Sequence, residues 1–366
     1  TAPKVTFSGV SRAGERPLDP ARTYTARAAG DIVELRSASG RLLARWRGVL
    51  TVGGTEAVQL AGPVPSGTTS GQWRGMLELR AGGGGELQAI NVVDLESYVR
   101  GVVAGESPSD WPAEALKAQA VAARTYAVTT QKSGTFDHFA DTRSQVYQGV
   151  AGETPTTDAA VAATADEVVT YDGRPVVTYF FSTSGGRTED NENSQLGGRP
   201  APWLRSVADP FDDASPHHRF GPRSWTARRA QDVLGGWVKG SLRSIEVVKR
   251  GTSPRIVRAD VVGSGGRTTV SGAQLRARLD LPDTWAYFAM IATTARPGTD
   301  RVLSGAVRPG GAGNSVRVER RSAEGRWRKV TDVATRAGGR YTLTVDRPGR
   351  YRIVERGMPG PAVRMR

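Results

Sequence analysis

The chain has 366 residues, no cysteine, 45 glycines, 21 prolines and a formal net charge of +14. The absence of cysteine excludes disulfide bonds and thiolate chemistry, and no apolar run of the sequence is long enough to span a bilayer. The hydrophobic content of 38% is that of a globular protein, and the length favours two or three domains.

The first part of the chain, up to about residue 92, has the pattern of β-strands. Residues 31–37 and 75–80 are typical, because they carry β-type side chains with partial alternation and are bounded by glycine-rich turns. The AGGGGE segment at residues 81–86 is expected to form a hairpin loop. This pattern predicts a β-rich N-terminal region.

Helical patterns begin at Asp94, which is a suitable N-cap for a short helix to about Val103. Pro112 suits the first turn of a second, alanine-rich helix that extends to about Thr130 and can pack closely through its small side chains. Glu106 falls between the two helices, in a segment rich in glycine, serine and proline. We therefore expect this carboxylate in a linker.

Shorter elements follow the two helices. Residues 154–167 have another helical pattern, and Asp172-Gly173 marks the turn of a hairpin. Strands return within residues 243–261, and a short helix is expected at residues 272–279.

The C-terminal residues 301–366 alternate strongly between apolar and polar side chains. They mark strands about every ten residues, which is typical of a small β-sandwich. The segment before them, residues 293–300, contains proline and glycine and is expected to be a linker.

Two common kinds of catalytic centre find little support in the sequence. The three histidines, His138, His217 and His218, show no metal-binding spacing and there is no cysteine, so no metal site is predicted. Ser182 and Ser184 follow a strand in the sequence STSGG, which is not the G-x-S-x-G pattern of a serine nucleophile. A strand-to-loop turn that lines a cleft is the preferred interpretation.

The net charge of +14 would attract polyanions such as nucleic acid, anionic lipid or an anionic cell wall. A second interpretation is that the charge only keeps the protein soluble. The basic residues are spread over the chain without a basic helix, an aromatic stacking motif or a zinc finger, so nucleic-acid binding is not predicted.

Glu106 is the carboxylate whose surroundings suit acid–base chemistry on a glycosidic bond. Such a bond needs an acid to protonate the leaving oxygen and a base or nucleophile to finish the reaction. Trp111 is near in the sequence and would shield Glu106 from water, which favours a protonated acid. The alternative is an ordinary surface glutamate, and the residues alone leave both interpretations open.

Residues 91–128, NVVDLESYVRGVVAGESPSDWPAEALKAQAVAARTYAV, closely resemble the signature of the stage II sporulation protein D family, also called the amidase-enhancer family. Further blocks match the family in the same order: DTRSQVYQG at 141–149, YFFSTSGGRTED at 179–190 and PWLRSV at 202–207. The resemblance covers residues 70–292.

The family contains bacterial lytic transglycosylases that cut peptidoglycan and prefer glycan strands stripped of their stem peptides. Its catalytic acid, the glutamate that ends the first block, matches Glu106. The resemblance implies that Glu106 protonates the oxygen between MurNAc and GlcNAc. The same residue would then act as a base and take the proton of the C6 hydroxyl, which gives a 1,6-anhydro end. No cofactor is implied.

Five further residues are expected at the site by the same resemblance. Gln145, Tyr147, Ser182 and Ser184 would border the cleft and bind sugar hydroxyls, while Arg124 would orient the site or hold backbone carbonyls. For Arg124 a structural salt bridge is the equal alternative, and for Tyr147 a place in the core.

Two departures from the family pattern matter. Many relatives have P-A-E-M where this chain has A-G-E-S at residues 104–107, so the walls of the glutamate's pocket differ. Some relatives bind zinc through Cys or His residues at positions that Arg143, Ser144 and Ser184 occupy here. Zinc is therefore expected to be absent from this member.

The sequence thus predicts an α+β fold with four parts. They are a β-rich region at residues 1–74, a catalytic core with an alanine-rich helix at 75–292, a linker at 293–300 and an all-β sandwich at 301–366.

The expected activity is that of a peptidoglycan lytic transglycosylase, and the alternative is a non-catalytic wall-binding protein that enhances an amidase. The expected partners are peptidoglycan glycan strands, with anionic wall polymers or a wall amidase as further candidates. The chain begins TAPKV, without a basic or apolar leader. The arginine-rich composition suits a secreted or cell-wall-associated protein, whose signal peptide is not in this chain.

Overall fold

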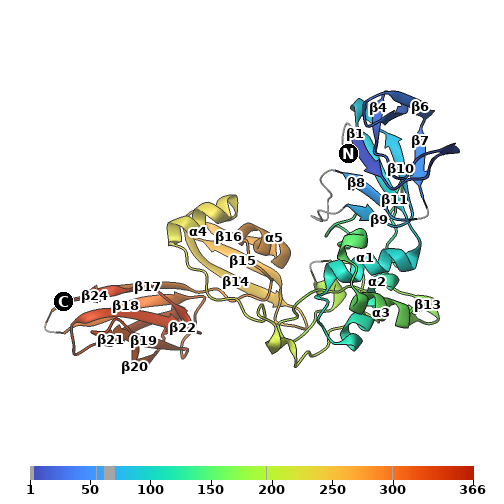
Figure 1. Ribbon diagram of the computed structural model, residues 1–366. Helices are drawn as coiled ribbons and strands as arrows, with labels where there is room; N and C mark the ends of the chain where they lie inside the picture. The colour runs from blue at the N-terminus through green and yellow to red at the C-terminus, as the bar shows by residue number, and fades with distance from the viewer. Residues whose placement is uncertain (1–3, 55, 62–70, 195, 299) are drawn as a thin grey trace. The chain divides into compact units, whose positions relative to one another are not determined.

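The structure is a computed structural model, and the chain forms two compact units, residues 1–180 and 181–366 (Figure 1). The residues that the structure describes are 4–54, 56–61, 71–194, 196–298 and 300–366.

The first unit begins with two antiparallel sheets. The six-stranded sheet has the order β6-β5-β4-β1-β8-β9, with β1 (Lys4–Ser8), β4 (Tyr24–Ala29), β5 (Ile32–Ser37), β6 (Leu42–Arg47), β8 (Val58–Ala61) and β9 (Gln72–Trp73). The five-stranded sheet has the order β11-β10-β7-β2-β3, with β2 (Arg12–Ala13), β3 (Arg16–Pro17), β7 (Val49–Gly53), β10 (Met76–Ala81) and β11 (Leu87–Val92).

The two sheets share one hydrophobic core. Alternate residues point into it, among them Phe7, Leu35, Leu50 and Leu79, which are at most 1% exposed. The AGGGGE segment connects β10 and β11, with Ala81 opposite Leu87, so the expected hairpin is confirmed. Because β10 pairs with β7, the N-terminal β-structure continues past the predicted boundary at residues 74 and 75.

Three helices follow in the first unit: α1 (Leu95–Glu106), α2 (Ala113–Thr129) and α3 (Pro155–Ala163). The Asp94 side chain caps α1 by accepting from the Ser97 amide at 2.9 Å, as expected of an N-cap. One buried cluster joins the three helices through Val99, Val103, Leu116, Ala120, Ala160 and Val161.

The linker prediction for Glu106 is wrong, because α1 extends three residues beyond Val103 and Glu106 is its last residue. Helix α1 continues through Gly105 despite the low helix propensity of glycine, since packing against neighbouring segments overrides propensity.

The unit closes with a short hairpin of β12 (Thr170–Tyr171) and β13 (Arg174–Pro175). Asp172 and Gly173 at its turn have φ of 49° and 73°, the left-handed values that a two-residue hairpin turn requires. The predicted turn is therefore confirmed.

The second unit contains a three-stranded antiparallel sheet of β14 (Leu242–Arg250), β15 (Ile256–Gly263) and β16 (Gly266–Ser271). Helices α4 (Ala227–Leu234) and α5 (Gly272–Leu279) share a core with it through Leu234, Val261 and Leu275. The bounds of α5 are those expected from the sequence, because Ser271 and Gln274 form a capping box at its start.

The C-terminal residues form two antiparallel sheets with one core, and this confirms the predicted β-sandwich. The first sheet has the order β17-β18-β21, with β17 (Met290–Arg296), β18 (Val302–Arg308) and β21 (Arg340–Thr344). The second contains β19 (Ser315–Arg321), β20 (Trp327–Ala334), β22 (Gly349–Glu355), β23 (Met358–Pro359) and β24 (Val363–Met365).

The expected linker at residues 293–300 needs correction. Residues 293–296 belong to β17 and pair with β18, because their alternation of exposed and half-buried side chains suits an edge strand. Residue 299, also within the expected linker, lies outside the described residues. The fold class is α+β, as predicted.

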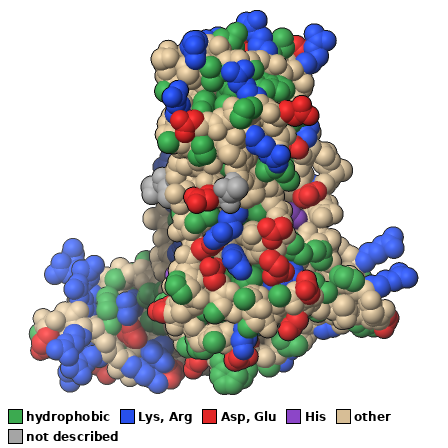
Figure 2. Space-filling model, turned by 45° about the vertical axis from the view of Figure 1, so that its right-hand side comes forward, with side chains coloured by type: hydrophobic (Ala, Val, Ile, Leu, Met, Phe, Trp, Pro, Cys, Tyr) green, Lys and Arg blue, Asp and Glu red, His purple; other side chains and the backbone are tan. Residues whose placement is uncertain are grey.

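The surface agrees with the spread of charge in the sequence. Figure 2 shows basic and acidic side chains side by side over much of one face. Within the described residues, no helix combines the length and apolar character that crossing a membrane requires.

Candidate functional site around Glu106

Glu106 lies at the C-terminal end of α1, where a segment from a later part of the chain crosses the helix. The backbone amide of Val146 donates a hydrogen bond to Glu106 Oε1 at 2.7 Å. One turn earlier on α1, the amide of Gln148 donates to the Gly101 carbonyl at 3.2 Å. The Q-V-Y block of the sequence is thus the segment that holds the carboxylate.

Two glycines on α1 permit this close approach. A Cβ atom on Gly101 would lie 2.5 Å from Tyr147 Cε2, and a Cβ on Gly105 would lie 2.4 Å from the Val146 carbonyl oxygen. Both separations are too short for real atoms, so in this geometry only glycine lets the crossing segment reach α1.

Replacing Gly101 with alanine is therefore expected to destabilise the protein by about 1–3 kcal/mol, the usual cost of overpacking a core. The sign is informative, because glycine to alanine inside a helix otherwise stabilises by about 1 kcal/mol. Urea unfolding measures the change. Gly82→Ala, in the extended backbone between β10 and β11, controls for glycine replacement without overpacking, since its Cβ would have ordinary contact at 3.5 Å from the Glu86 carbonyl oxygen. A stabilised Gly101→Ala protein would contradict the described packing.

Within the described part of the chain, the carboxylate of Glu106 is held at one oxygen. The Val146 amide is the one hydrogen-bond donor to it among these residues, and none of their lysines, arginines or histidines lies within ion-pair distance. The side chain is half-buried, and Trp111 in the following turn is 45% exposed. An amide can only donate, so Oε1 acts as the acceptor and a proton on this acid resides on Oε2.

The Q-V-Y block also brings two predicted site residues to α1. Gln145 is fully buried, and its Nε2 donates to the Tyr98 hydroxyl at 3.3 Å while its Oε1 has no partner among the described residues. Tyr147 is 5% exposed and donates to Asn91 Oδ1 at 2.7 Å. The Tyr147 ring lies 4.9 Å from that of Tyr98 and 5.2 Å from that of Trp73, in a buried cluster. Tyr147 therefore lies in the core, which is the alternative that the sequence left open for it.

Tyr98 is a site residue that the sequence reasoning did not single out. The sequence feature that could have identified it is its place as the tyrosine of the L-E-x-Y block, four residues after the N-cap. Burial raises the pKa of Tyr98 to about 12, and the negative charge of Glu106 acts in the same direction. The phenol therefore keeps its proton in the folded protein at neutral pH.

Alkaline pH is expected to weaken folding between about pH 10 and 12. The pKa of Tyr98 and that of Tyr341 are both raised by burial to about 12, so over this range the folded chain binds more protons than the unfolded chain. The free energy of unfolding then falls as pH rises. Absorbance titration of the tyrosines checks this, and Tyr98→Phe should remove one late-titrating group. If Tyr98→Phe left the late titration unchanged, the burial of Tyr98 would be contradicted.

Arg124, the third predicted residue on this unit, is 1% exposed and joins the helices. Its Nε and Nη2 donate to the two carboxylate oxygens of Glu96 at 2.7 and 2.8 Å. Nη1 donates to the Glu167 carbonyl at 3.1 Å, and Nη2 also donates to the Val161 carbonyl at 3.3 Å. The salt bridge and the carbonyl contacts considered from the sequence are thus both present, and a contact with substrate stays a prediction.

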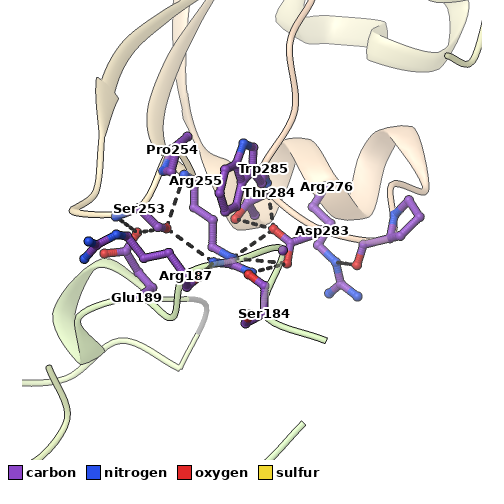
Figure 3. Close-up of polar contacts among 12 residues, drawn as sticks. Ser184, Arg187, Glu189, Ser253, Pro254, Arg255, Arg276, Asp283, Thr284 and Trp285 are labelled. Atoms are coloured by element: carbon purple, nitrogen blue, oxygen red, sulfur yellow. Dashed lines mark hydrogen bonds and ion pairs between the residues drawn. The ribbon is translucent and has the colours of Figure 1, made fainter. Parts of the chain in front are cut away.

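Ser182 and Ser184, the remaining predicted residues, belong to the second unit. Ser182 is exposed, whereas Ser184 is 3% exposed. Figure 3 shows how the Ser184 loop is anchored: Arg255 donates through Nη2 to the Ser184 carbonyl at 2.7 Å and through Nη1 to the Arg187 carbonyl at 2.8 Å. Asp283 pairs with Arg255 at 3.1 Å. The S-T-S-G-G block is therefore a firmly held loop, and its contact with sugar stays a prediction.

In the part of the chain that the structure describes, no group of three or more histidine, aspartate or glutamate side chains is arranged to hold a metal ion.

Parts of the chain are similar to known proteins. A family model described as stage II sporulation protein matches residues 83–171. Stage II sporulation protein D of Bacillus subtilis is 34% identical over 216 residues, 53% of this chain and 60% of that protein. The protein of the same name from Bacillus amyloliquefaciens is 30% identical over 211 residues, 53% of this chain and 59% of that protein.

The amidase enhancer of Bacillus subtilis is 37% identical over 115 residues, which are 31% of this chain and 15% of that protein. The chain spans about three fifths of the two sporulation proteins that it matches. The residues matched by the family model include α1, α2 and the segment that binds Glu106. The chain therefore contains, at residues 83–171, a domain of the stage II sporulation protein D and amidase-enhancer family.

Proposed function

We propose that this protein is a peptidoglycan lytic transglycosylase with Glu106 as its acid and base. The observation that carries the proposal is the state of the Glu106 carboxylate. It is half-buried, oriented through Oε1 by the Val146 amide, and, among the described residues, bound to no cation. A carboxyl group that is oriented but not neutralised by an ion pair can both give and take a proton.

The reaction needs no second carboxylate and no water. Glu106 Oε2–H would protonate the oxygen that joins C1 of MurNAc to GlcNAc, and the C1–O bond would break. The C6 hydroxyl of the same MurNAc would then attack C1 and pass its proton to Glu106. The products are a GlcNAc hydroxyl end and a 1,6-anhydroMurNAc end, and Glu106 is again protonated. One residue therefore serves both proton transfers.

The other predicted residues are proposed to act in two ways. Arg124, Gln145 and Tyr147 are buried and hold α1 and the crossing segment, so we assign them to positioning Glu106. Ser182 is exposed and has a hydroxyl suited to sugar, whereas Ser184 is buried and holds its own loop. The glycan contacts of both serines remain proposals.

A second candidate is a non-catalytic protein that binds the wall and enhances an amidase. The similarity to a protein named amidase enhancer supports it, as does the A-G-E-S sequence at residues 104–107. In either case we propose a secreted or wall-associated protein that binds glycan strands, with the net charge of +14 favouring anionic wall polymers.

Product analysis separates the two candidates. The purified chain is incubated with peptide-free and with peptide-bearing glycan strands, and the products are examined by mass spectrometry. New 1,6-anhydro ends, more abundant from peptide-free strands, are expected. Intact strands that co-sediment with the protein would overturn the enzyme proposal and favour the amidase enhancer.

A further inference from the structure

A buried carboxylate on the second unit orients one histidine. Asp212, the first residue of the short 3-10 helix η4 (Asp212–Ala214), is 8% exposed. It accepts hydrogen bonds from the Ser184 amide at 2.6 Å, from the Gly185 amide at 3.0 Å and from His218 Nδ1 at 2.6 Å. This arrangement joins His218 to the S-T-S-G-G loop.

The bonding fixes which ring nitrogen of His218 carries the proton. Burial alone would raise the pKa of Asp212, but the hydrogen bonds from His218, Ser184 and Gly185 outweigh it and hold the pKa below its usual range. An ionised carboxylate only accepts, so His218 Nδ1 must be a donor. In the neutral ring Nε2 is then a free acceptor, as in other imidazoles that a carboxylate orients.

The other ring nitrogen of His218, Nε2, has no hydrogen-bond partner among the described residues, and the His218 side chain is 21% exposed. Nε2 is therefore available to a ligand. The ring packs against Gly186, where a Cβ atom would lie 3.7 Å from His218 Cε1. Phe211, next to Asp212 in the chain, is 81% exposed, which is unusual for so large an apolar side chain.

We propose that His218 is a glycan-binding residue whose Nε2 accepts a hydrogen bond from a sugar hydroxyl or from the N–H of an acetamido group. Because Nε2 is an acceptor, the ligand must supply a donor, and an N-acetylated sugar supplies both kinds. Phe211 provides an apolar surface nearby in the sequence for a sugar ring. The proposal rests on the proposed function, since it takes the glycan strand as ligand.

A purely structural role for the pair is the alternative, and His218→Asn addresses it. Asparagine places its amide NH₂ where Nδ1 lies, so the bond to Asp212 is kept while Nε2 is lost. The bonds from Ser184 and Gly185 to Asp212 also remain. The neighbouring His217 is exposed and makes no such contact within the described residues, so His217→Asn is the matched control.

Nitrogen-15 NMR of the imidazole rings tests the proposal in the full chain carrying Glu106→Gln, which prevents turnover. Only three histidines contribute signals, so the two asparagine variants assign them. In the free protein, His218 should show the tautomer protonated at Nδ1. On addition of peptide-free glycan strands, its Nε2 signal should shift and saturate while the His217 signals stay.

Strand affinity, measured by co-sedimentation, should fall about three- to tenfold in His218→Asn, the worth of one hydrogen bond, and stay unchanged in His217→Asn. If strands bind but the His218 signal and the affinity of His218→Asn do not change, the inference is overturned and the proposed function stands. If strands neither bind to this protein nor are cleaved by the wild-type chain, both the inference and the proposed function are overturned. A ring protonated at Nε2 would also overturn the inference.

Discussion

Glu106→Gln is expected to abolish the release of 1,6-anhydro ends from glycan strands. General acid–base catalysis by one side chain contributes about 10²- to 10⁴-fold in rate, and here one residue serves both proton transfers. Glutamine has the same shape, and its Oε1 can still accept from the Val146 amide. The loss should therefore appear in the rate of cleavage, measured by quantifying anhydro ends over time.

Two controls keep this prediction specific. The thermal midpoint of Glu106→Gln should match that of the wild type, because the hydrogen bond to Val146 is kept. Glu114→Gln, on the exposed surface of α2 where Glu114 pairs with Lys117, should cleave at the wild-type rate. Undiminished cleavage by Glu106→Gln would place the acid elsewhere in the chain.

Arg124→Met is expected to lower the free energy of unfolding by about 3 kcal/mol, which urea unfolding measures. Removing one partner of a buried ion pair commonly costs about 3–5 kcal/mol because the other charge loses its compensation. The lower end applies here, since the Glu96 side chain is 31% exposed and regains some water. The carbonyls of Val161 and Glu167 would lose their donors as well.

Arg143→Met is the matched control for this prediction. Arg143 makes a similar two-oxygen pair with Asp141, but its side chain is 59% exposed, so its loss should lower the free energy of unfolding far less than the loss of Arg124. A stable Arg124→Met protein that had lost only strand binding would contradict the positioning role and support direct contact with substrate.

The sequence predicted the local elements well because their signals are local. Asp94 as an N-cap, the Asp172-Gly173 turn and the short helix at residues 272–279 each depend on neighbouring residues, and the structure confirms them. The C-terminal β-sandwich was predicted from the alternation of apolar and polar side chains, and the structure has two sheets there. The end of α1 was predicted too early, at about Val103, because Gly105 and the residues after it have the composition of a linker.

The contacts that shape the candidate site are long-range, and single-sequence patterns do not contain them. Glu106 meets Val146 across 40 residues, and Arg124 meets Glu96 across 28. The role of Gly101 becomes visible only when Tyr147 is seen against it. Likewise, the adjacent histidines looked equivalent in sequence, and only the position of Asp212 distinguishes His218.

In the proposed reaction, Glu106 drives an internal attack by the C6 hydroxyl and not an attack by water. Cleavage of peptide-free strands in water enriched in oxygen-18, followed by mass spectrometry of the new ends, tests this most directly. We expect 1,6-anhydroMurNAc ends without oxygen-18. Reducing ends that carry oxygen-18 would show a hydrolase and rule out the internal attack.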